Sequence, residues 1–213
     1  MNNGRQAASP CAQHAKRPAS KVPAVPDGKS LAVWTIEAGH ESEYLDRLIL
    51  SSDDEEIISV AEEYGCEVPF RRPAELVRDD TPSMDALLHA LEQVESHDYV
   101  VLLQPTSPLR AADDIDTTIV SFHRNGGTAC VTVTETDKPP QWMHTLLDDY
   151  RLRPVLKRDE RANRRQDAPK TYVLNGAVSV ARPECLRQHE PFHTDEPIAY
   201  IMPPERSVDV DTK

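Results

Sequence analysis

The strongest constraint on the fold is a regular alternation of strand-like and helix-like patterns between residues 31 and 134. One helix face is formed by apolar residues at i, i+3, i+4, i+7 and i+10, namely Met84, Leu87, Leu88, Leu91 and Val94. A buried strand over residues 98–103 follows this helix. Strand, helix, strand, helix and strand at this spacing predict an α/β fold with a parallel sheet covered by helices on both faces.

The expected elements follow the same reading along the chain. Helices are expected over 31–38, 53–65, 83–94 and 113–126. Strands are expected over 47–50, 66–68, 98–103, 129–134, 172–180, 198–202 and 208–210. Residues 137–170 break the rhythm, because they are polar and contain a hairpin pattern at 145–156 and a basic run at 161–165. We interpret this stretch as an insertion or arm.

The charge of the chain excludes one class of partner. The 213 residues include 36 acids and 24 Lys and Arg, a formal net charge of −12. Residues 1–26 carry four bases and no acid, so the remainder carries −16. Such a surface is unsuited to gripping a nucleic acid. To bind an anion, it needs a metal ion or a local cluster of bases.

The apolar runs and the cysteines give two further expectations. The longest aliphatic run, 100–103, is far too short to span a membrane. The four cysteines are widely separated and form no CxxC pair. We therefore expect reduced thiols in a cytoplasmic protein.

The N-terminal segment differs from the rest. Residues 1–27 show no apolar period and carry prolines at positions 10, 18, 23 and 26. Proline fixes φ and removes a backbone donor, so neither a regular helix nor a central strand is expected here. We predict that 1–27 is a divergent, disordered segment and that 28–213 forms one domain.

The first candidate site follows the predicted strand 98–103. Ligands of an open parallel sheet bind beyond the carboxyl ends of its strands. Gln104 comes directly after the strand, and the polar residues Thr106, Ser107 and Arg110 follow in a loop stiffened by two prolines. A ligand-binding loop and an ordinary strand-to-helix turn are both open.

The second candidate site is the pair Asp209 and Asp211. On a strand, residues i and i+2 share a face, so both carboxylates would point one way while Val208 and Val210 point into the core. Two such carboxylates repel unless a cation lies between them. Oxygen ligands of this kind favour Mg²⁺, which completes its shell with water and substrate phosphates. The alternative is a solvated acidic edge.

The third candidate site is the cluster of Arg161, Arg164 and Arg165. Guanidinium groups suit carboxylates and phosphates. The alternative is a solvated loop paired with the nearby acids Asp159, Glu160 and Asp167.

Six motifs, in order, resemble those of the acylneuraminate cytidylyltransferases, the CMP-sialic acid synthetases. They are residues 51–57 (SSDDEEI), 72–76 (RPAEL), 102–110 (LLQPTSPLR), 164–166 (RRQ), 175–177 (NGA) and 206–212 (RSVDVDT). The resemblance covers about residues 28–213. It implies a doubly wound, mostly parallel mixed sheet of the nucleotide-diphospho-sugar transferase type. It also implies a homodimer, because the family's arm, here about 137–170, closes the site of a second subunit.

The resemblance implies a reaction. The anomeric hydroxyl of a nonulosonic acid, such as N-acetylneuraminic acid, attacks the α-phosphorus of CTP, pyrophosphate leaves, and a CMP-sugar forms. Mg²⁺ would neutralise the charge that builds on the phosphates. Legionaminic and related acids remain alternative substrates.

The family's roles fall on specific residues of this chain. The metal ligands match Asp209 and Asp211. The cytidine contacts match Arg72, Thr81 and Ser83. The acidic sugar contacts match Gln104, Arg165 and Asn175.

The N-terminus departs from the family pattern. The family opens with an apolar strand and a glycine-rich loop that wraps the triphosphate. Here an ungapped count places Lys16 and Lys21 on the family's two lysines, and we take Lys21 as the catalytic lysine, but Ala12 stands on the arginine and Gln13 and His14 on glycines.

These departures lead to three expectations. Residues 1 to about 27 would come from a reading-frame error or from a degraded first exon-like segment. The C-terminus would lack the family's last helix, and activity would be weak or absent. The alternative function is a non-catalytic paralogue that binds a nucleotide or only dimerises.

Overall fold

The computed structural model describes residues 29–78, 81–95, 97–138, 140–156, 169–190, 192 and 196–210, and the backbone of residues 7–12. The strands are β1 (Ala7–Ala12), β2 (Arg47–Ser51), β3 (Tyr99–Leu103), β4 (Ala129–Glu135), β5 (His144–Leu146), β6 (Leu152–Pro154), β7 (Tyr172–Ala181) and β8 (Ile198–Ile201). The helices are α1 (Leu31–His40), α2 (Glu55–Glu63), α3 (Ser83–Gln93), α4 (Ala112–Asn125) and α5 (Pro183–Arg187). Short 3₁₀ turns are η2 (Ala74–Leu76), η3 (Pro140–Trp142) and η6 (Pro204–Arg206).

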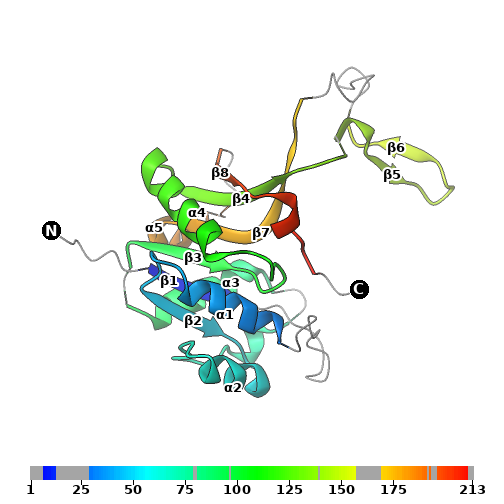
Figure 1. Ribbon diagram of the computed structural model, residues 1–213. Coiled ribbons are helices and arrows are strands. Elements are labelled where there is room, and N and C mark those ends of the chain that lie inside the picture. The colour runs from blue at the N-terminus through cyan, green and yellow to red at the C-terminus, as the bar shows by residue number, and fades with distance from the viewer. Residues whose placement is uncertain are drawn as a thin grey trace.

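The main sheet has the strand order β2-β1-β3-β7-β4-β8 (Figure 1). β7 runs antiparallel to both of its neighbours, β3 and β4. The other pairs, β1 with β2, β1 with β3 and β4 with β8, are parallel. The expected mostly parallel mixed sheet is therefore confirmed.

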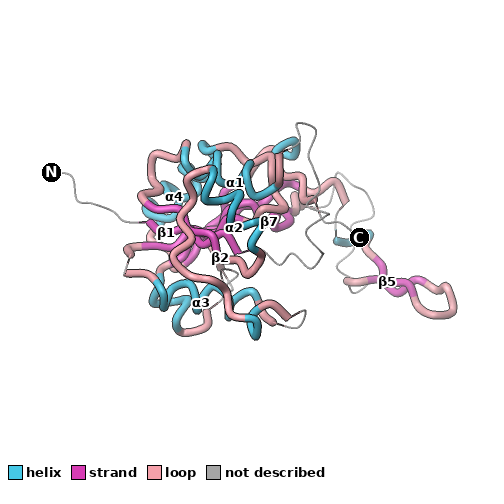
Figure 2. The backbone as a smooth tube through the Cα atoms, turned by 90° about the horizontal axis from the view of Figure 1, so that it is seen from below, coloured by secondary structure: helices cyan, strands magenta, loops and turns pink. Residues whose placement is uncertain are grey.

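Apolar clusters lie on both faces of this sheet. One cluster joins α1, α2 and α4 to the sheet through Ile36, Ile58 and Ile119. The other joins α3 and α5 to the opposite face through Leu87, Leu91 and Leu186. Figure 2 shows α3 on one side of the strands and α1 and α4 on the other. Helices on both faces make the fold doubly wound, as expected.

Local sequence signals explain where the helices begin and end. The carboxylate of Asp54 accepts hydrogen bonds from the backbone N–H groups of Glu56 and Ile57, at 2.9 and 3.2 Å, so it caps α2. Gly126 ends α4 with φ +66°, a conformation that glycine adopts without a steric penalty. No helix within the described ranges is long and apolar enough to cross a membrane.

The strand β1 corrects one expectation. We expected no strand before residue 28, but residues 7–12 form a parallel strand in the middle of the sheet. Its ladder with β2 runs from Ala8 to Ala12, whereas its ladder with β3 stops at Ala8, before Pro10. Proline has no N–H to donate, so a proline argues against a central strand. For this reason Pro10 kept β1 from being predicted from the sequence. The rest of 1–27 lies outside the described residues.

The expected arm is present. β5 and β6 form an antiparallel hairpin, closed by hydrogen bonds between Leu147 and Arg151 and between Tyr150 and Leu147, each 2.9 Å. The hairpin projects away from the sheet beyond the paired ends of β4 and β7 (Figure 1). The turn falls at Asp148 and Asp149, within the hairpin pattern predicted for 145–156.

Two expected strands are wrong. The range 66–68 contributes a single bridge, between Glu67 and Ile49. The range 208–210 is irregular, and Val208, expected in the core, is 45% exposed. The chain leaves the sheet after β8 through Pro203 and the turn η6, and Val210 then bonds to a loop instead of a strand.

Candidate functional site

Gln104 lies at the carboxyl end of β3, where the sequence placed it. Its side chain is exposed and lies against Gly176. Gly176 has φ +67°, and a Cβ there would collide with Gln104 Oε1. The positive φ therefore favours glycine at this position, and a larger side chain would also force the exposed Gln104 side chain to move aside. Two of the motifs, around Gln104 and around Gly176, meet at this point.

The loop after Gln104 joins two further parts of the chain. Ser107 is fully buried, and its Oγ donates a 3.0 Å hydrogen bond to the carbonyl oxygen of Asn175. The backbone N–H of Val210 donates a 2.7 Å bond to the carbonyl oxygen of Thr106. The C-terminal segment that carries Asp209 therefore lies directly against the 104–107 loop.

The buried side chain of Arg110 connects the same loop to β7 and α1. It is 4% exposed, and its guanidinium donates to the carbonyl oxygens of Gln104 and Ala177. It also donates to Thr35 Oγ1 of α1 at 2.8 Å. Because these acceptors belong to three different elements, Arg110 holds the loop rigidly against β7 and α1.

Asn175, predicted to contact the sugar, is occupied by the protein. It is 6% exposed, and its Oδ1 accepts from Thr132 Oγ1 at 2.6 Å and from the Ala177 N–H at 3.2 Å. Its Nδ2 donates to Ser207 Oγ at 3.0 Å and contacts Met202 Sδ at 3.3 Å. Contact with a sugar stays a prediction, whereas the link between β7 and the C-terminal segment is present.

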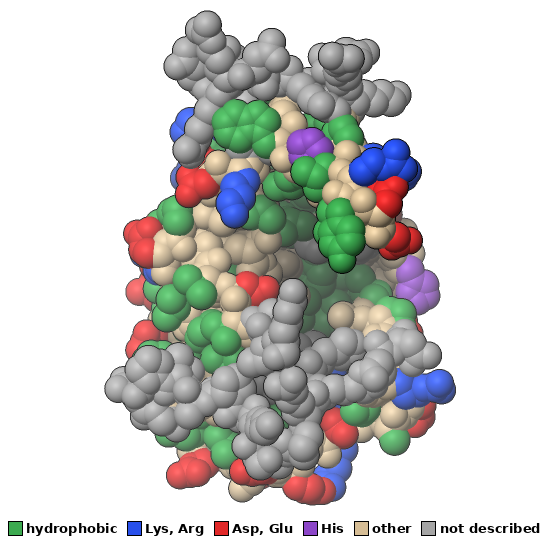
Figure 3. Space-filling view, turned by 90° about the vertical axis from the view of Figure 1, so that its right-hand side faces the viewer, with side chains coloured by type: hydrophobic (Ala, Val, Ile, Leu, Met, Phe, Trp, Pro, Cys, Tyr) green, Lys and Arg blue, Asp and Glu red, His purple; other side chains and the backbone are tan. Residues whose placement is uncertain are grey.

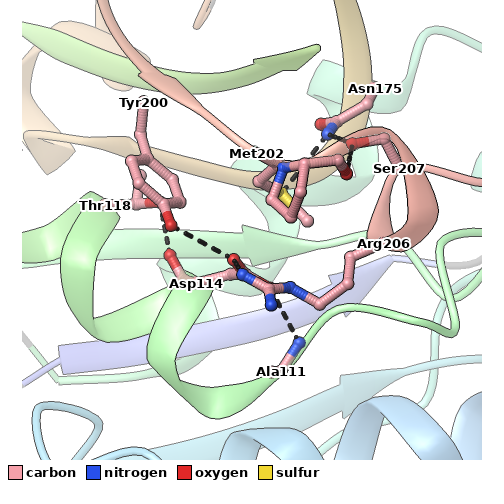
Figure 4. Close-up of polar contacts among 9 residues, drawn as sticks. Ala111, Asp114, Thr118, Asn175, Tyr200, Met202, Arg206 and Ser207 are labelled. Atoms are coloured by element: carbon pink, nitrogen blue, oxygen red, sulfur yellow. Dashed lines mark hydrogen bonds and ion pairs between the residues drawn. The ribbon is translucent and has the colours of Figure 1, made fainter.

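Arg206 ties the C-terminal segment to α4 (Figure 4). Its Nε and one terminal nitrogen donate to the two carboxylate oxygens of Asp114, at 2.9 and 2.8 Å. Asp114 is fully buried and also accepts from the Ala111 N–H at 2.9 Å and from Tyr200 Oη at 3.3 Å. The bond to Asp114 raises the pKa of Arg206. Burial, and then the charge of Asp114, raise the pKa of Tyr200.

This cluster was missed at the sequence level. Arg206 stands in a motif, but Asp114 sits in the first turn of α4, where an acid is typical of any helix. Tyr200 gave no signal, because only the pairing of β8 with β4 brings it to this place.

Arg72, the first residue predicted to contact cytidine, lies at β2, two strands along the sheet from β3. Arg72 is 4% exposed and donates from Nε to Ser51 Oγ at 3.2 Å, at the carboxyl end of β2. β1 separates β2 from β3 and Gln104. Thr81 Oγ1 donates to the Glu75 carbonyl oxygen at 3.2 Å, and Ser83 is exposed at the first position of α3. Because β2 and β3 run parallel, Arg72 shares the ligand-binding edge of the sheet with Gln104.

Several predicted residues lie outside the described residues. These are Lys21, Asp211 and the whole arginine cluster of Arg161, Arg164 and Arg165. Asp209 is described and exposed, but it does not lie on a strand. Within the described ranges, no three His, Cys, Asp or Glu side chains gather as a metal site. The donor chemistry of an exposed aspartate at the ligand-binding edge still fits Mg²⁺, which needs few protein ligands.

Residues 21–186 match the sequence family described as Cytidylyltransferase. This chain belongs to the cytidylyltransferase family. A relative, the N-acylneuraminate cytidylyltransferase of Escherichia coli O18:K1:H7, is 32% identical over 186 residues, which are 87% of this chain and 44% of the relative. The CMP-N,N'-diacetyllegionaminic acid synthase of Legionella pneumophila is 27% identical over 191 residues, which cover 87% of this chain and 81% of that protein.

The fold comparison agrees with the family. A structure of CMP:2-keto-3-deoxy-manno-octonic acid synthetase complexed with CTP superposes with a TM-score of 0.67 at 12% identity, covering 94% of this cytidylyltransferase chain and 90% of the other. The α/β fold predicted from the sequence is thereby confirmed. The chain spans less than half of the Escherichia coli relative and about four fifths of the Legionella relative.

Proposed function

We propose that this chain transfers CMP from CTP to the anomeric hydroxyl of a nonulosonic acid, such as N-acetylneuraminic acid, with release of pyrophosphate. The bond from the Val210 N–H to the Thr106 carbonyl oxygen, 2.7 Å long, carries the proposal. It sets an acidic segment beside the loop of Gln104 at the edge where such sheets bind ligands. The names of the relatives supply the substrate class.

Two sets of residues would hold the substrates. Gln104, exposed beside Gly176, is free to contact the sugar, and Arg165 would bind its carboxylate. Arg72, Thr81 and Ser83 would contact the cytidine. Lys21 would contact the triphosphate from the segment that follows β1 in sequence. CTP and an acidic sugar, and no nucleic acid, are therefore the proposed partners.

Mg²⁺ is the proposed cofactor, with Asp209 and Asp211 as its protein ligands. When bound, it supplies positive charge to phosphate oxygens that gain negative charge during transfer. The chain's own part is to hold the acidic segment against the 104–107 loop, so that the sugar hydroxyl and the α-phosphate are brought together in one orientation.

A homodimer is proposed from the arm. Leu146 and Leu152 are each 65% exposed, Tyr150 is 86% exposed and Val155 56%. Figure 3 shows apolar side chains gathered around a hollow on the side of the molecule from which the arm projects. Exposed apolar side chains gathered in one place are typical of a protein interface. A cytoplasmic location stays a prediction from the spacing of the cysteines.

The expected absence of the first strand was one reason to predict weak or absent activity, and this reason no longer applies. The strand that we expected to be missing is present as β1. The reading-frame hypothesis, which rests on the composition of residues 1–27 and on the onset of the family motifs near residue 28, stays a prediction. The sequence at positions 12–14 still lacks the family's arginine and glycines. We therefore propose an active but slow enzyme.

A pyrophosphate-release assay with CTP, Mg²⁺ and each candidate acid tests the proposal. We expect turnover with a nonulosonic acid and none without it. Asp209→Asn should lower kcat by about 10²-fold or more, because a ligand to the reacting phosphates is lost. Glu205→Gln, an exposed acid four residues away, is the matched control and should keep the rate. Equal rates for the two variants would contradict the assignment of Asp209.

The alternative is a non-catalytic paralogue, favoured by the residues at 12–14. CTP with Mg²⁺ should raise the melting temperature of a nucleotide binder. A thermal shift without turnover would indicate the paralogue, and no shift would indicate a purely dimerising role.

A further inference from the structure

The short segment 206–210 has little regular structure of its own. It belongs to no strand, and only its first residue belongs to the turn η6. Apart from the backbone bond from Val210 to Thr106, its place beside the 104–107 loop therefore depends on side-chain contacts. Two such contacts stand next to each other in the chain, at Arg206 and Ser207 (Figure 4).

The first contact ends on a fully buried charge. Asp114 is 0% exposed, and Arg206 bonds to both of its oxygens. The Ala111 N–H and Tyr200 Oη fill further acceptor positions of the same carboxylate. A buried carboxylate with a bidentate arginine has a narrow range of allowed geometries, so it fixes Arg206 in direction as well as in distance.

The second contact fixes the next residue. Ser207 Oγ accepts from Asn175 Nδ2 at 3.0 Å and donates to the Pro203 carbonyl oxygen at 2.9 Å. Asn175 is itself held through Thr132 on β4. Arg206 and Ser207 are thus attached to α4 and to β7, two elements on either side of the segment's path.

We propose that Asp114, acting through Arg206, is a positioning residue for the metal-binding segment, with Asn175, acting through Ser207, as its counterpart on β7. Asp114 does not touch the substrate. It sets the course of the backbone from Arg206 to Val210, and so the place of Asp209 relative to the 104–107 loop. This inference rests on the proposed function of Asp209 as a metal ligand.

Hydrogen–deuterium exchange tests the positioning without any turnover. The variants are Asp114→Asn, which keeps the size of the side chain, and Tyr200→Phe, which removes one hydroxyl and is the milder change. Arg47→Gln is the matched control, because Arg47 bonds to the exposed Glu67 at 2.9 Å on the far edge of the sheet. In Asp114→Asn, the peptide covering 203–210 should exchange about tenfold faster, while the peptide of β3 stays protected.

Mn²⁺ binding in the presence of CTP, measured by electron paramagnetic resonance, tests the consequence. We expect Asp114→Asn to weaken Mn²⁺ binding about tenfold or more, as loss of a residue that orients a metal ligand does elsewhere. Tyr200→Phe should give a smaller effect in the same direction, and Arg47→Gln none. In the turnover assay, the Mg²⁺ concentration for half-maximal rate should rise while the KM for the sugar stays the same.

The outcomes separate this inference from the proposed function. Unchanged exchange over 203–210 in a folded Asp114→Asn protein would overturn the positioning role, whether or not the chain is an enzyme. Faster exchange with unchanged Mn²⁺ binding would overturn its link to the metal. If Asp209→Asn keeps full activity, the proposed function of Asp209 fails, while the exchange result for Asp114 still stands or falls alone.

Discussion

The C-terminal segment 203–210 and the arm leave the sheet from neighbouring strands, but they differ in their contacts with the rest of the chain. The segment continues from β8 and bonds to α4, β7 and the 104–107 loop, all within the chain. The arm continues from β4, and the polar bonds of its described hairpin, residues 140–156, are local, such as Thr145 Oγ1 to the Arg153 carbonyl oxygen at 3.2 Å. Its apolar side chains stay exposed.

The difference shows that segments leaving neighbouring strands can serve two purposes, one in building the site and one in association. The segment is ordered by buried, charged contacts that need nothing outside the chain. The arm offers apolar area that is covered only when a second surface meets it. We therefore expect changes in the segment to alter folding and catalysis, and changes in the arm to alter association.

The largest expected effect comes from breaking the buried pair. Arg206→Met leaves the carboxylate of Asp114 buried without its cation, and this should lower the free energy of unfolding by about 3 kcal/mol. The value lies at the low end of the usual range because the Arg206 side chain is 36% exposed. Urea unfolding measures it.

Arg47→Met is the matched control for this prediction. It removes the cation from the more exposed pair with Glu67, whose side chain is 50% exposed. The loss should be less than about 1 kcal/mol. Equal losses for the two variants would contradict the contrast between buried and exposed pairs.

The next effect is expected in the arm. Leu146 and Leu152 face each other across the hairpin. Replacing both with Glu should raise the dimer dissociation constant by about 10²-fold, because charges would have to be buried in the interface. Sedimentation equilibrium measures the constant. The unfolding free energy of the monomer should change by no more than about 0.5 kcal/mol.

Tyr64→Glu is the control for the arm variant. Tyr64 is 40% exposed at the end of α2, away from the arm. It should leave association unchanged. A wild-type protein that stays monomeric at every concentration tested would contradict the role of the arm.

The smallest expected effect is a pH dependence of the unfolding free energy, which should come from a histidine outside the arm. Burial lowers the pKa of His97 from its ordinary value of 6.5, and the charge of Arg47 adds to this. His97 is 8% exposed, and neither ring nitrogen has a hydrogen-bond partner among the described residues. The unfolded chain therefore takes up the proton at a higher pH than the folded chain, and stability should fall as pH drops below 6.5.

A comparison of two histidines checks this prediction. His97→Gln should flatten the fall in unfolding free energy between pH 7 and pH 5. His144→Gln, at an exposed position of β5 in the arm, should leave the slope as it is. The same slope in both variants would show that His97 is not the source.

Most of the sheet could be predicted because its strands are short apolar runs between helical patterns. β3 and β4 were predicted within about a residue. β1 could not be predicted, since Ala, Ser and Pro10 give no strand signal and only its place between β2 and β3 makes it one. The range 208–210 has alternating apolar residues, but the prolines before it turn the chain away from the sheet.

The site could be predicted only in part. Gln104 was expected at the ligand-binding edge, and the motif around Gly176, noted only as a family match, meets it there. The family resemblance assigned Asn175 to the sugar. In the structure, its amide is occupied by hydrogen bonds with Thr132 and Ser207. No pattern along the chain connects Asp114 with Arg206, because they are 92 residues apart.

Oxygen labelling tests the central claim, that a sugar hydroxyl attacks the α-phosphorus of CTP, most directly. The wild-type protein would be incubated with CTP, Mg²⁺ and N-acetylneuraminic acid labelled with ¹⁸O at the anomeric hydroxyl, and the product weighed by mass spectrometry. The account predicts a CMP-sugar that keeps the label in its bridging oxygen. A CMP-sugar without the label, or CMP released with no sugar attached, would contradict it.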